Sequence, residues 1–404
     1  MKNFKLSEFI DQNVTFRSES MFKEDLHNNN SQLNDQINNQ SVLVIGGAGT
    51  IGSSFIKELI KYEPRKLIVV DTNENSLTEL TRDLRSSHSL KVPNEYKTYP
   101  MDFGDAVFHR MFKETGPFDI VANFAAHKHV RSEKDQYSVI SLIQNNLFKA
   151  DKLLSLLDEF KPKHFFCVST DKAANPVNVM GASKKMMEEM IMAYSKKFKI
   201  STARFANVAF SNGSLLDGFI NRISKSQPLS APKDVKRYFV SPEESGQICL
   251  IACILGSTGD VFYPKLRPSQ MLTFSQIADR FLKSIGYKPF LCMNEEEAKI
   301  RATELGENGL DYPVYYFQSD TTGEKGFEEF YTGSEKLDLK SFSKLGVIKN
   351  ASTKLVIEVQ NALNGLDELI SRNEVSKSEI VSYFNSYLSD FDHNETGKNL
   401  DQRM

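Results

Sequence analysis

The sequence predicts a doubly wound parallel α/β fold joined to a smaller, interleaved C-terminal domain. Between residues 41 and 208, short apolar runs rich in β-branched residues alternate with longer segments whose apolar residues recur at helical spacing. Such alternation is typical of a parallel sheet whose crossover helices cover both faces. A glycine cluster at the first junction of strand and helix supports the same fold. After Asn207 the alternation stops, and the loops and isolated helices that follow predict the second domain.

The predicted elements follow in chain order. Six short runs are expected to be strands, at residues 41–47, 66–71, 95–102, 118–126, 163–169 and 200–208. The segments between them predict helices, because their apolar residues recur every three or four positions. The clearest are 50–64, 75–87, a long helix from about 137 to 157, and 179–198. Further along, we expect helices within 246–256 and 270–287 and an acidic, exposed segment at 295–309.

Composition divides the chain into domains. Residues 41–210 form the predicted Rossmann-type domain, to which 236–264 return, while 211–235 and 265–404 form the second domain and a polar tail. Residues 1–40 are polar, and we expect an arm of partial order. It is either flexible or carries a short helix near Leu6 to Ile10 that docks on a neighbouring subunit. The tail after residue 391 is expected to be mobile.

Charge and cysteine content exclude several classes of protein. Against 52 acidic residues stand 50 Lys and Arg, so the formal net charge is −2, and no concentrated basic surface for nucleic acid is expected. Four cysteines in 404 residues do not make a disulfide scaffold, and we expect buried, reduced thiols and no metal site. No apolar stretch reaches the length of a membrane span, and no signal sequence is recognised, so a cytoplasmic protein is expected.

The first glycine cluster predicts a dinucleotide site. Gly46, Gly49 and Gly52 form G-x-x-G-x-x-G after the first strand, and Thr50 and Ile51 open the following helix. Glycines permit a tight turn and let a pyrophosphate approach the N-terminus of that helix. A structural glycine turn without a ligand is the alternative.

An acidic residue follows the second strand at the distance this motif requires. Asp71 ends that strand, where its carboxylate can accept from an adenosine ribose and repel a 2′-phosphate, which favours NAD. Arg82 and Arg85 keep NADP open. Asp102 and Phe103, after the third strand, are expected at the adenine edge, although Asp102 can instead cap the segment from Gly104.

The fifth strand ends in a pair of groups suited to acid–base chemistry. Thr170, Asp171 and Lys172 follow it, at the sheet edge where ligands bind in such folds. Met180 and Lys184 lie one helical turn apart on the next helix. An adjacent carboxyl and amine can donate and accept protons at neighbouring atoms of one substrate.

These motifs resemble the extended short-chain dehydrogenase/reductase superfamily, whose usual Tyr-x-x-x-Lys pair falls at Met180 and Lys184. Together with NFAAHKHV (123–130) and RFANV (204–208), STDKAANPVNVMGASK (169–184) is similar to nucleotide-sugar 4,6-dehydratases of polysaccharide biosynthesis. The similarity is greatest to UDP-N-acetylglucosamine 4,6-dehydratases, including those of legionaminic-type pathways. It extends from Ser41 to the C-terminus.

The resemblance implies roles for the catalytic residues. Asp171 is expected to protonate the departing C6 hydroxyl and Lys172 to take the C5 proton, for which we expect burial or Lys184 to lower the pKa of Lys172. With Met180 in place of tyrosine, the C4 hydroxyl proton passes to Thr170, Asp171 or water. Methionine marks the branch that retains C5 configuration, so retention is expected.

The resemblance also implies the binding residues. Ala125 and Ala126 are expected against the nicotinamide, with Lys128 and His129 beside them, and Lys184 is also expected to contact the cofactor, although a structural role for the histidines is equally open. Thr321 stands where the family has arginine, so UDP is expected first and GDP second. The residues implied to bind the nucleotide sugar elsewhere in the chain are Asn207, Ser211, Asn212, Gly213, Arg237, Lys325 and Glu328.

Assembly and two other functions complete the expectations. The helices at 137–157 and 179–198 carry apolar stripes (Ile140, Ile143, Leu147, Met186, Met190 and Ile191). Such stripes are usually core, but the resemblance implies that these two helices form a four-helix interface of a homodimer or higher homo-oligomer. A C4 epimerase is one alternative function, but it normally needs the tyrosine. A non-catalytic NAD(P)-sensing protein is the other, and the presence of Asp171, Lys172 and Lys184 argues against it.

Overall fold

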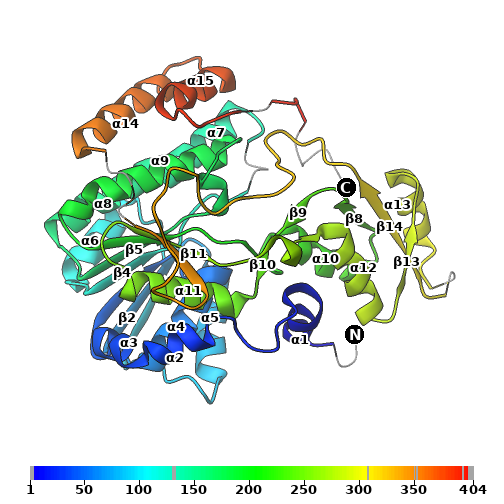
Figure 1. Cartoon of the computed structure of the whole chain (residues 1–404), viewed down its shortest axis with the longest axis horizontal. Coiled ribbons are helices and arrows are strands. Elements are labelled where there is room, and N and C mark those ends of the chain that lie inside the picture. The colour runs from blue at the N-terminus through cyan, green and yellow to red at the C-terminus, as the bar shows by residue number, and fades with distance from the viewer. Residues whose placement is uncertain are drawn as a thin grey trace.

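A nine-stranded sheet organises the larger part of the described chain (Figure 1). The computed structural model describes residues 4–129, 133–306, 309–349, 351, 354–393 and 395–398. The strand order is β15-β16-β11-β6-β5-β4-β1-β2-β3, and the seven strands from β11 to β3 run parallel. Their bounds are β1 (Ser41–Ile45), β2 (Lys66–Asp71), β3 (Glu95–Pro100), β4 (Ile120–Asn123), β5 (His164–Val168), β6 (Ile200–Ala203) and β11 (Asp260–Pro264).

Helices cover both faces of this sheet, which confirms the doubly wound prediction. On one face, α4 (Thr50–Leu59) packs against α11 (Pro242–Leu255), and on the other, α8 (Lys149–Glu159) packs against α9 (Val179–Ala193). The long predicted helix is interrupted, since α7 (Gln136–Ile143) and α8 are joined by a π-helical turn. The crossovers also contain α5 (Glu74–Ser86) and α6 (Ala106–Thr115). Strand order reverses between β1 and β4, and this opens a crevice at their carboxyl ends.

The second domain is built on a three-stranded parallel sheet, β13-β14-β8. Its core gathers around the fully buried ring of Phe281, which contacts Phe210 and Phe219. Two short pairings, β7 with β10 and β9 with β12, lie between the domains. The elements are β7 (Asn207–Val208), α10 (Leu215–Ser224), β8 (Leu229–Pro232), β9 (Lys236–Arg237), β10 (Phe239–Val240), β12 (Leu272–Thr273), α12 (Phe274–Ser284), β13 (Lys288–Leu291), α13 (Glu295–Thr303) and β14 (Asp311–Phe317).

The helix expected near Leu6 to Ile10 is present, but the N-terminal segment packs on its own chain, so a flexible arm or one docked on a neighbouring subunit is wrong for the described residues. In α1 (Leu6–Ile10), Phe9 packs on Phe281 in the core of the second domain. Between α2 (Lys23–Asn28) and α11 lies α3 (Asn30–Ile37), which packs against both and buries Leu33. The segment has few apolar residues, but they fill cores that later segments build.

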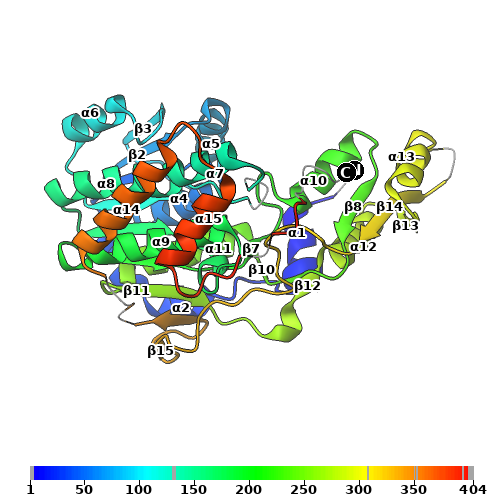
Figure 2. The ribbon, with the colours of Figure 1, turned by 90° about the horizontal axis from the view of Figure 1, so that it is seen from above.

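The boundary placed at residue 265 is also wrong, because the chain returns to the first domain. On the outer edge of the large sheet, β16 (Leu345–Ile348) pairs antiparallel with β11, and β15 (Leu337–Asp338) pairs with β16. After β16 come two helices, α14 (Val356–Ile370) and α15 (Lys377–Tyr387). Both pack on α9, and α15 also contacts α7. Seen from above, the pair lies over the helical layer (Figure 2).

This helical pair covers the face expected to form a dimer. Ile143, Leu147, Met186, Met190 and Ile191 are fully buried within the single chain, and Ile140 is partly buried. The apolar stripes are therefore core of the single chain, with α14 packed on α9 and α15 on α7 and α9, and the predicted four-helix interface is wrong. A homo-oligomer assembled through another surface stays a prediction.

Two expectations about the whole chain can be compared with the structure. All four cysteines are buried and free, as predicted, and burial raises the pKa of Cys167 to about 11. Among the helices of the described ranges, none combines the length and apolar character needed to cross a membrane.

We predict that Leu366→Ala lowers the free energy of unfolding by about 2–5 kcal/mol, because Leu366 is fully buried in α14 and truncation leaves a cavity. Ile357→Ala on the same helix is the matched control, since its side chain is 61% exposed. This control should change stability by less than about 0.5 kcal/mol. Urea denaturation measures both, and equal effects would contradict the packing of α14 on the domain.

Candidate active site

Two glycines of the turn between β1 and α4, Gly46 and Gly49, have different structural roles. Gly46 has a φ of +70°, and a Cβ there would lie 2.5 Å from the backbone nitrogen of Ala125. At Gly49 a Cβ would meet one atom within 4 Å, the carbonyl oxygen of Gly46 at 3.5 Å. The fold therefore requires glycine at 46, whereas at 49 it leaves open space at the N-terminus of α4, where an anion is favoured.

A cavity of about 250 Å³ opens beside this turn. The residues that the sequence predicts to bind a cofactor line it, apart from Lys184: Gly46, Gly49, Thr50, Ile51, Gly52, Asp71, Asp102, Phe103, Ala125 and Ala126. Lys128 lines it as well. Seven further lining residues are not among the predicted cofactor residues: Ile45, Val70, Thr72, Met101, Phe124, His127 and Asn145. Thr72 and Met101 directly follow the second and third strands, so their place at strand ends could have predicted them. Asn145 lies in the π-helical turn, and no sequence pattern marked it.

Two carboxylates face this cavity. Asp71 accepts hydrogen bonds from the N–H groups of Ala48 and Asn73, each at 3.0 Å, which fixes it beside the glycine turn. Asp102 accepts from the N–H of Gly104 at 2.8 Å and pairs with Lys149. Burial alone would raise the pKa of Asp102, but Lys149 and the Gly104 N–H hold it below its usual value.

The two arginines that left NADP binding possible, Arg82 and Arg85, lie away from the cavity. Arg82 pairs with Glu79 on the exposed face of α5. Arg85 lies over the ring of Tyr96, with its guanidinium carbon 5.9 Å from the ring centroid. Neither residue lines the cavity.

The predicted acid–base pair is a buried contact at the end of β5. Asp171 Oδ1 accepts from Thr170 Oγ1 at 2.9 Å and lies 3.1 Å from Lys172 Nζ. Because β4 and β5 are adjacent parallel strands, these residues share the sheet edge with Ala125 and Ala126. An alcohol, a carboxylate and an amine are therefore in contact at this sheet edge, although Thr170, Asp171 and Lys172 do not line the cavity itself.

Lys172 has a second carboxylate partner that adjacency in sequence did not reveal. Glu328 Oε1 lies 3.6 Å from Lys172 Nζ and 3.7 Å from Arg237 Nη2, and all of these side chains are largely buried. Burial by itself lowers the pKa of Lys172, but Asp171 and Glu328 outweigh it and raise the pKa. The expected lowering is wrong because two carboxylates face the ammonium group.

Met180 and Lys184 lie on α9, and both are buried. Lys184 Nζ donates to the carbonyl oxygen of Val168 at 2.7 Å. Burial lowers the pKa of Lys184. Lys184 does not line the cavity, so its contact with a cofactor stays a prediction.

Loops expected to bind substrate meet beside the glycine turn. Lys128 Nζ donates to the carbonyl oxygen of Asn212 at 3.3 Å, and the Asn212 N–H donates to Thr50 Oγ1 at 2.9 Å. His129 Nε2 lies 3.3 Å from where a Cβ of Gly213 would be. Burial lowers the pKa of Lys128. The loop after β4 therefore contacts the segment after β7, where the buried Ser211 also lies, and Asn207 is the first residue of β7.

The segment at 321–329 closes the other side of the acid–base pair. The amide of Asn178 donates to the Gly323 carbonyl oxygen at 2.8 Å, and Lys325 Nζ donates to the carbonyl oxygen of Asn175. Arg237 is buried, with Nη1 donating to the Lys325 carbonyl oxygen at 2.9 Å and Nη2 to Glu324 at 3.3 Å. In this structure Arg237 thus binds protein carboxylates, and its contact with substrate phosphates stays a prediction.

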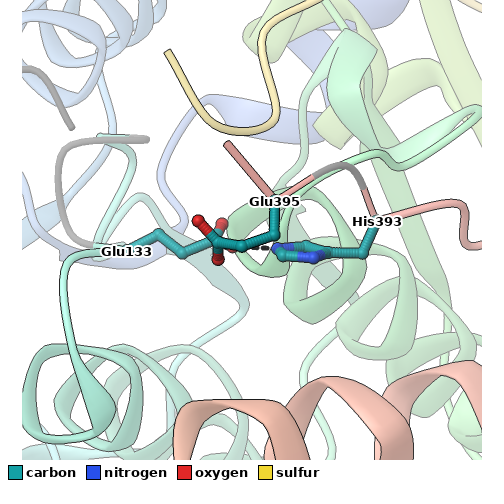
Figure 3. A group of neighbouring side chains, drawn as sticks. All are labelled: Glu133, His393 and Glu395. Carbon is teal, nitrogen blue, oxygen red and sulfur yellow. Dashed lines mark hydrogen bonds and ion pairs between the residues drawn. The ribbon is translucent and has the colours of Figure 1, made fainter. Parts of the chain in front are cut away.

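The described part of the tail is anchored to the same region. Glu133 meets His393 and Glu395 of the tail, and one side-chain oxygen or nitrogen atom of each lies within 4.8 Å of the others (Figure 3). Lys377 of α15 supplies a cation to this cluster, 2.6 Å from Glu395 and 3.7 Å from Glu133. Glu133 also accepts the Val179 N–H at 2.7 Å, at the start of α9.

These contacts correct the expectation that the tail is mobile. The cluster attaches the tail to the helix that carries Met180 and Lys184, and the Thr322 N–H donates to the Lys398 carbonyl oxygen at 3.0 Å. Residues 394 and 399–404 of the expected tail lie outside the described residues.

The sequence is similar to several proteins of known name. It is 28% identical over 245 residues to a UDP-N-acetylglucosamine 4,6-dehydratase (inverting) from Campylobacter jejuni, covering 58% of this chain and 70% of the relative. It is 24% identical over 306 residues to a UDP-glucose 4-epimerase from Rickettsia canadensis, covering 70% and 87%. Over 351 residues it is 26% identical to the capsular polysaccharide biosynthesis protein CapD from Staphylococcus aureus, covering 81% of this chain but only 54% of CapD, so the chain spans about half of that relative.

A solved structure has the same fold. The X-ray structure of Pen from Bacillus thuringiensis aligns with a TM-score of 0.63 at 22% identity, over 88% of this chain and 98% of Pen. A family model described as polysaccharide biosynthesis protein matches residues 42–349, which include the large sheet from β1 to β16, the glycine turn and the acid–base pair. The chain therefore belongs to the polysaccharide biosynthesis protein family.

Proposed function

We propose that this protein is an NAD-dependent 4,6-dehydratase of a nucleotide-diphosphate N-acetylhexosamine, within the dehydratase and epimerase class of nucleotide-sugar enzymes. UDP-N-acetylglucosamine is the first substrate to test and a GDP-sugar the second. The observation that carries the proposal is the buried contact between Asp171 and Lys172, 3.1 Å apart at the sheet edge that also borders the cavity. Elimination of water next to a ketone needs such an acid and base side by side.

The residues around the cavity fit an adenine dinucleotide. The open space at Gly49 suits a pyrophosphate, and the carboxylate of Asp71 suits a ribose with a free 2′-hydroxyl. Bound NAD supplies hydride chemistry, accepting a hydride from C4 of the sugar and returning it to C6. Because Arg82 and Arg85 do not line the cavity, NAD is preferred over NADP.

Thr170 and Asp171 offer a path for the C4 hydroxyl proton. Met180 has a thioether, which cannot take a proton from an alcohol at neutral pH. Thr170 Oγ1 already donates to Asp171 Oδ1 at 2.9 Å. A proton that enters at Thr170 can therefore pass to Asp171, which then holds it for the C6 hydroxyl that leaves as water.

Lys172 is the proposed base at C5. Oxidation at C4 acidifies the C5 hydrogen, and a neutral amine can remove it. The same ammonium group then returns the proton to the face from which it came. A single base on one face supports retention of configuration at C5, as the methionine at position 180 also favours.

Epimerase activity is the second candidate, because a UDP-glucose 4-epimerase is among the relatives. Incubation with NAD and UDP-N-acetylglucosamine, followed by mass spectrometry, separates the functions. Loss of one water supports the dehydratase, whereas an isomer of unchanged mass supports the epimerase. A protein that binds NAD but converts neither UDP-sugar nor GDP-sugar would instead support a sensor.

The glycine turn gives a prediction that separates folding from binding. Gly49→Ala should leave the thermal midpoint nearly unchanged, because the added methyl group meets no atom closer than 3.5 Å. It should weaken NAD binding by about tenfold or more, since the methyl occupies the space open to the pyrophosphate. Gly46→Ala should lower the midpoint through its positive φ and backbone clash. Calorimetry and thermal unfolding measure both effects, and unchanged NAD affinity in Gly49→Ala would contradict the proposed site.

Asp71→Asn should reduce affinity for NAD more than affinity for NADP. The amide still accepts a hydrogen bond from the turn but loses the charge that repels a 2′-phosphate and binds a ribose strongly. We expect the ratio of NAD to NADP affinity to fall about tenfold. Titration of each cofactor into both proteins gives this ratio, and an unchanged ratio would mean that Asp71 does not contact the ribose.

Lys172→Met should permit C4 oxidation but stop elimination. Reduced nicotinamide and a 4-keto sugar that keeps its C6 hydroxyl should then accumulate on the enzyme, and exchange of the C5 hydrogen with deuterated water should stop. Asp171→Asn should instead block C4 oxidation if Asp171 is the proton acceptor. Rapid-mixing absorbance and NMR of the C5 position distinguish these results. Normal C5 exchange in Lys172→Met would point to Lys184 as the base.

A further inference from the structure

Glu328 is a buried carboxyl group that the mechanism above leaves unused. It lies on the segment that closes over the acid–base pair, 3.6 Å from Lys172 Nζ and 3.7 Å from Arg237 Nη2. The hydrogen bond from Asn178 to the Gly323 carbonyl oxygen anchors this segment against the loop that carries Lys172. Within the described chain, Asp171 and Glu328 are the carboxylates paired with Lys172.

The proposed reaction requires the protein to hold a second proton besides the one that Asp171 takes from the C4 hydroxyl. Lys172 faces two carboxylates at rest and is an ammonium ion, so it must lose a proton before it can act as a base at C5. Asp171 is already committed, because with Met180 in place of tyrosine it receives the proton from the C4 hydroxyl. The proton of Lys172 therefore goes either to solvent or to a second acceptor within reach, and Glu328 is the other carboxylate paired with Lys172.

We propose that Glu328 is the positioning residue that takes the ammonium proton of Lys172 and returns it at the end of each cycle, an inference that rests on the proposed function. The N–H bond of Lys172 breaks and an O–H bond forms on Glu328, which leaves a neutral amine and a neutral carboxylic acid. Lys172 then removes the C5 proton, and Asp171 gives its proton to the departing C6 hydroxyl, so that water leaves. Lys172 returns its proton to C5, and Glu328 returns the stored proton to Lys172.

The proposed transfer leaves the total charge of this buried group unchanged. Lys172 is paired with Asp171 and Glu328, Arg237 with Glu328 and Glu324, and a proton that moves from Lys172 to Glu328 stays among these groups. A buried site resists changes of net charge, because a charge without a partner loses its solvation. Burial raises the pKa of Glu328, and Asp171 adds to the rise, so this carboxyl group holds a proton more readily than an exposed glutamate. Lys172, Arg237 and Lys325 oppose the rise without cancelling it.

The test follows C5 hydrogen exchange in deuterated water against pH, with NAD and UDP-N-acetylglucosamine bound. In the wild-type protein, internal transfer to Glu328 should make the exchange rate nearly independent of pH through neutrality. In Glu328→Gln the ammonium must lose its proton to solvent. Exchange should then fall about tenfold or more near neutral pH and rise roughly tenfold per pH unit below the pKa of Lys172. Formation of reduced nicotinamide, which precedes this step, should persist.

Two variants serve as controls. Glu329→Gln removes the neighbouring carboxyl group, which is exposed and accepts a hydrogen bond from the Asn175 amide, and it should keep the wild-type profile. Glu328→Asp keeps a carboxyl group, so its profile should stay flat even if the rate falls. Should Glu328→Gln fail to fold in a thermal unfolding assay, the aspartate variant decides, and a profile that rises with pH overturns the proposal.

Other outcomes separate the two proposals. If Glu328 serves only to keep Lys172 charged, its loss should lower the pKa of Lys172 and speed exchange near neutral pH. Faster or unchanged exchange in Glu328→Gln, with normal wild-type turnover, therefore overturns the role of Glu328 alone. A wild-type protein that neither releases water nor exchanges the C5 hydrogen overturns the dehydratase function, and with it this inference.

Discussion

The need to balance buried charge at the end of β5 is the constraint around which the active region is arranged. Lys172 and Arg237 are buried cations, and Asp171 and Glu328 are the buried carboxylates that pair with them. An unpaired charge at such a position would cost several kcal/mol or shift its protonation state. The segments at 236–237 and 321–329 must therefore meet the loop after β5 before the site is stable, although they are distant in sequence.

A second group of buried ion pairs holds α9, the helix behind this site, in place. Arg204, at the end of β6, pairs with Glu188 of α9 at 2.7 Å and with Glu335 at 2.9 Å. It also donates to the Phe330 carbonyl oxygen at 3.1 Å. Glu335 and Phe330 flank the return of the chain to the large sheet. The same guanidinium group thus joins the helix of Met180 and Lys184 to the segment that carries Glu328.

The described parts of both ends of the chain contribute packing to the two domains. Phe9 and Leu33 complete separate cores from the N-terminal segment, while α14 and α15 cover the helical face of the large sheet. The cluster of Glu133, His393, Glu395 and Lys377 then joins the tail to the start of α9. Hydrophobic burial therefore holds the N-terminal segment and α14, whereas charge pairing holds the tail.

The sequence by itself determined the parts of the site that are local. The glycine turn, Asp71 at the end of the next strand, and the adjacent Asp171 and Lys172 each depend on a strand end and a short spacing. Parallel strands bring such ends to one edge, so most predicted cofactor residues do line one cavity.

Only the tertiary structure decided what each exposed or buried side chain faces. Helical periodicity marked Met186 and Met190 as apolar, but a buried stripe has the same pattern whether a second subunit or α14 covers it. Likewise, the pKa of Lys172 is raised and not lowered because Glu328 approaches from 156 residues away along the chain. Electrostatic interactions and packing depend on distances in space. The sequence alone gives such distances only for residues that are close together along the chain.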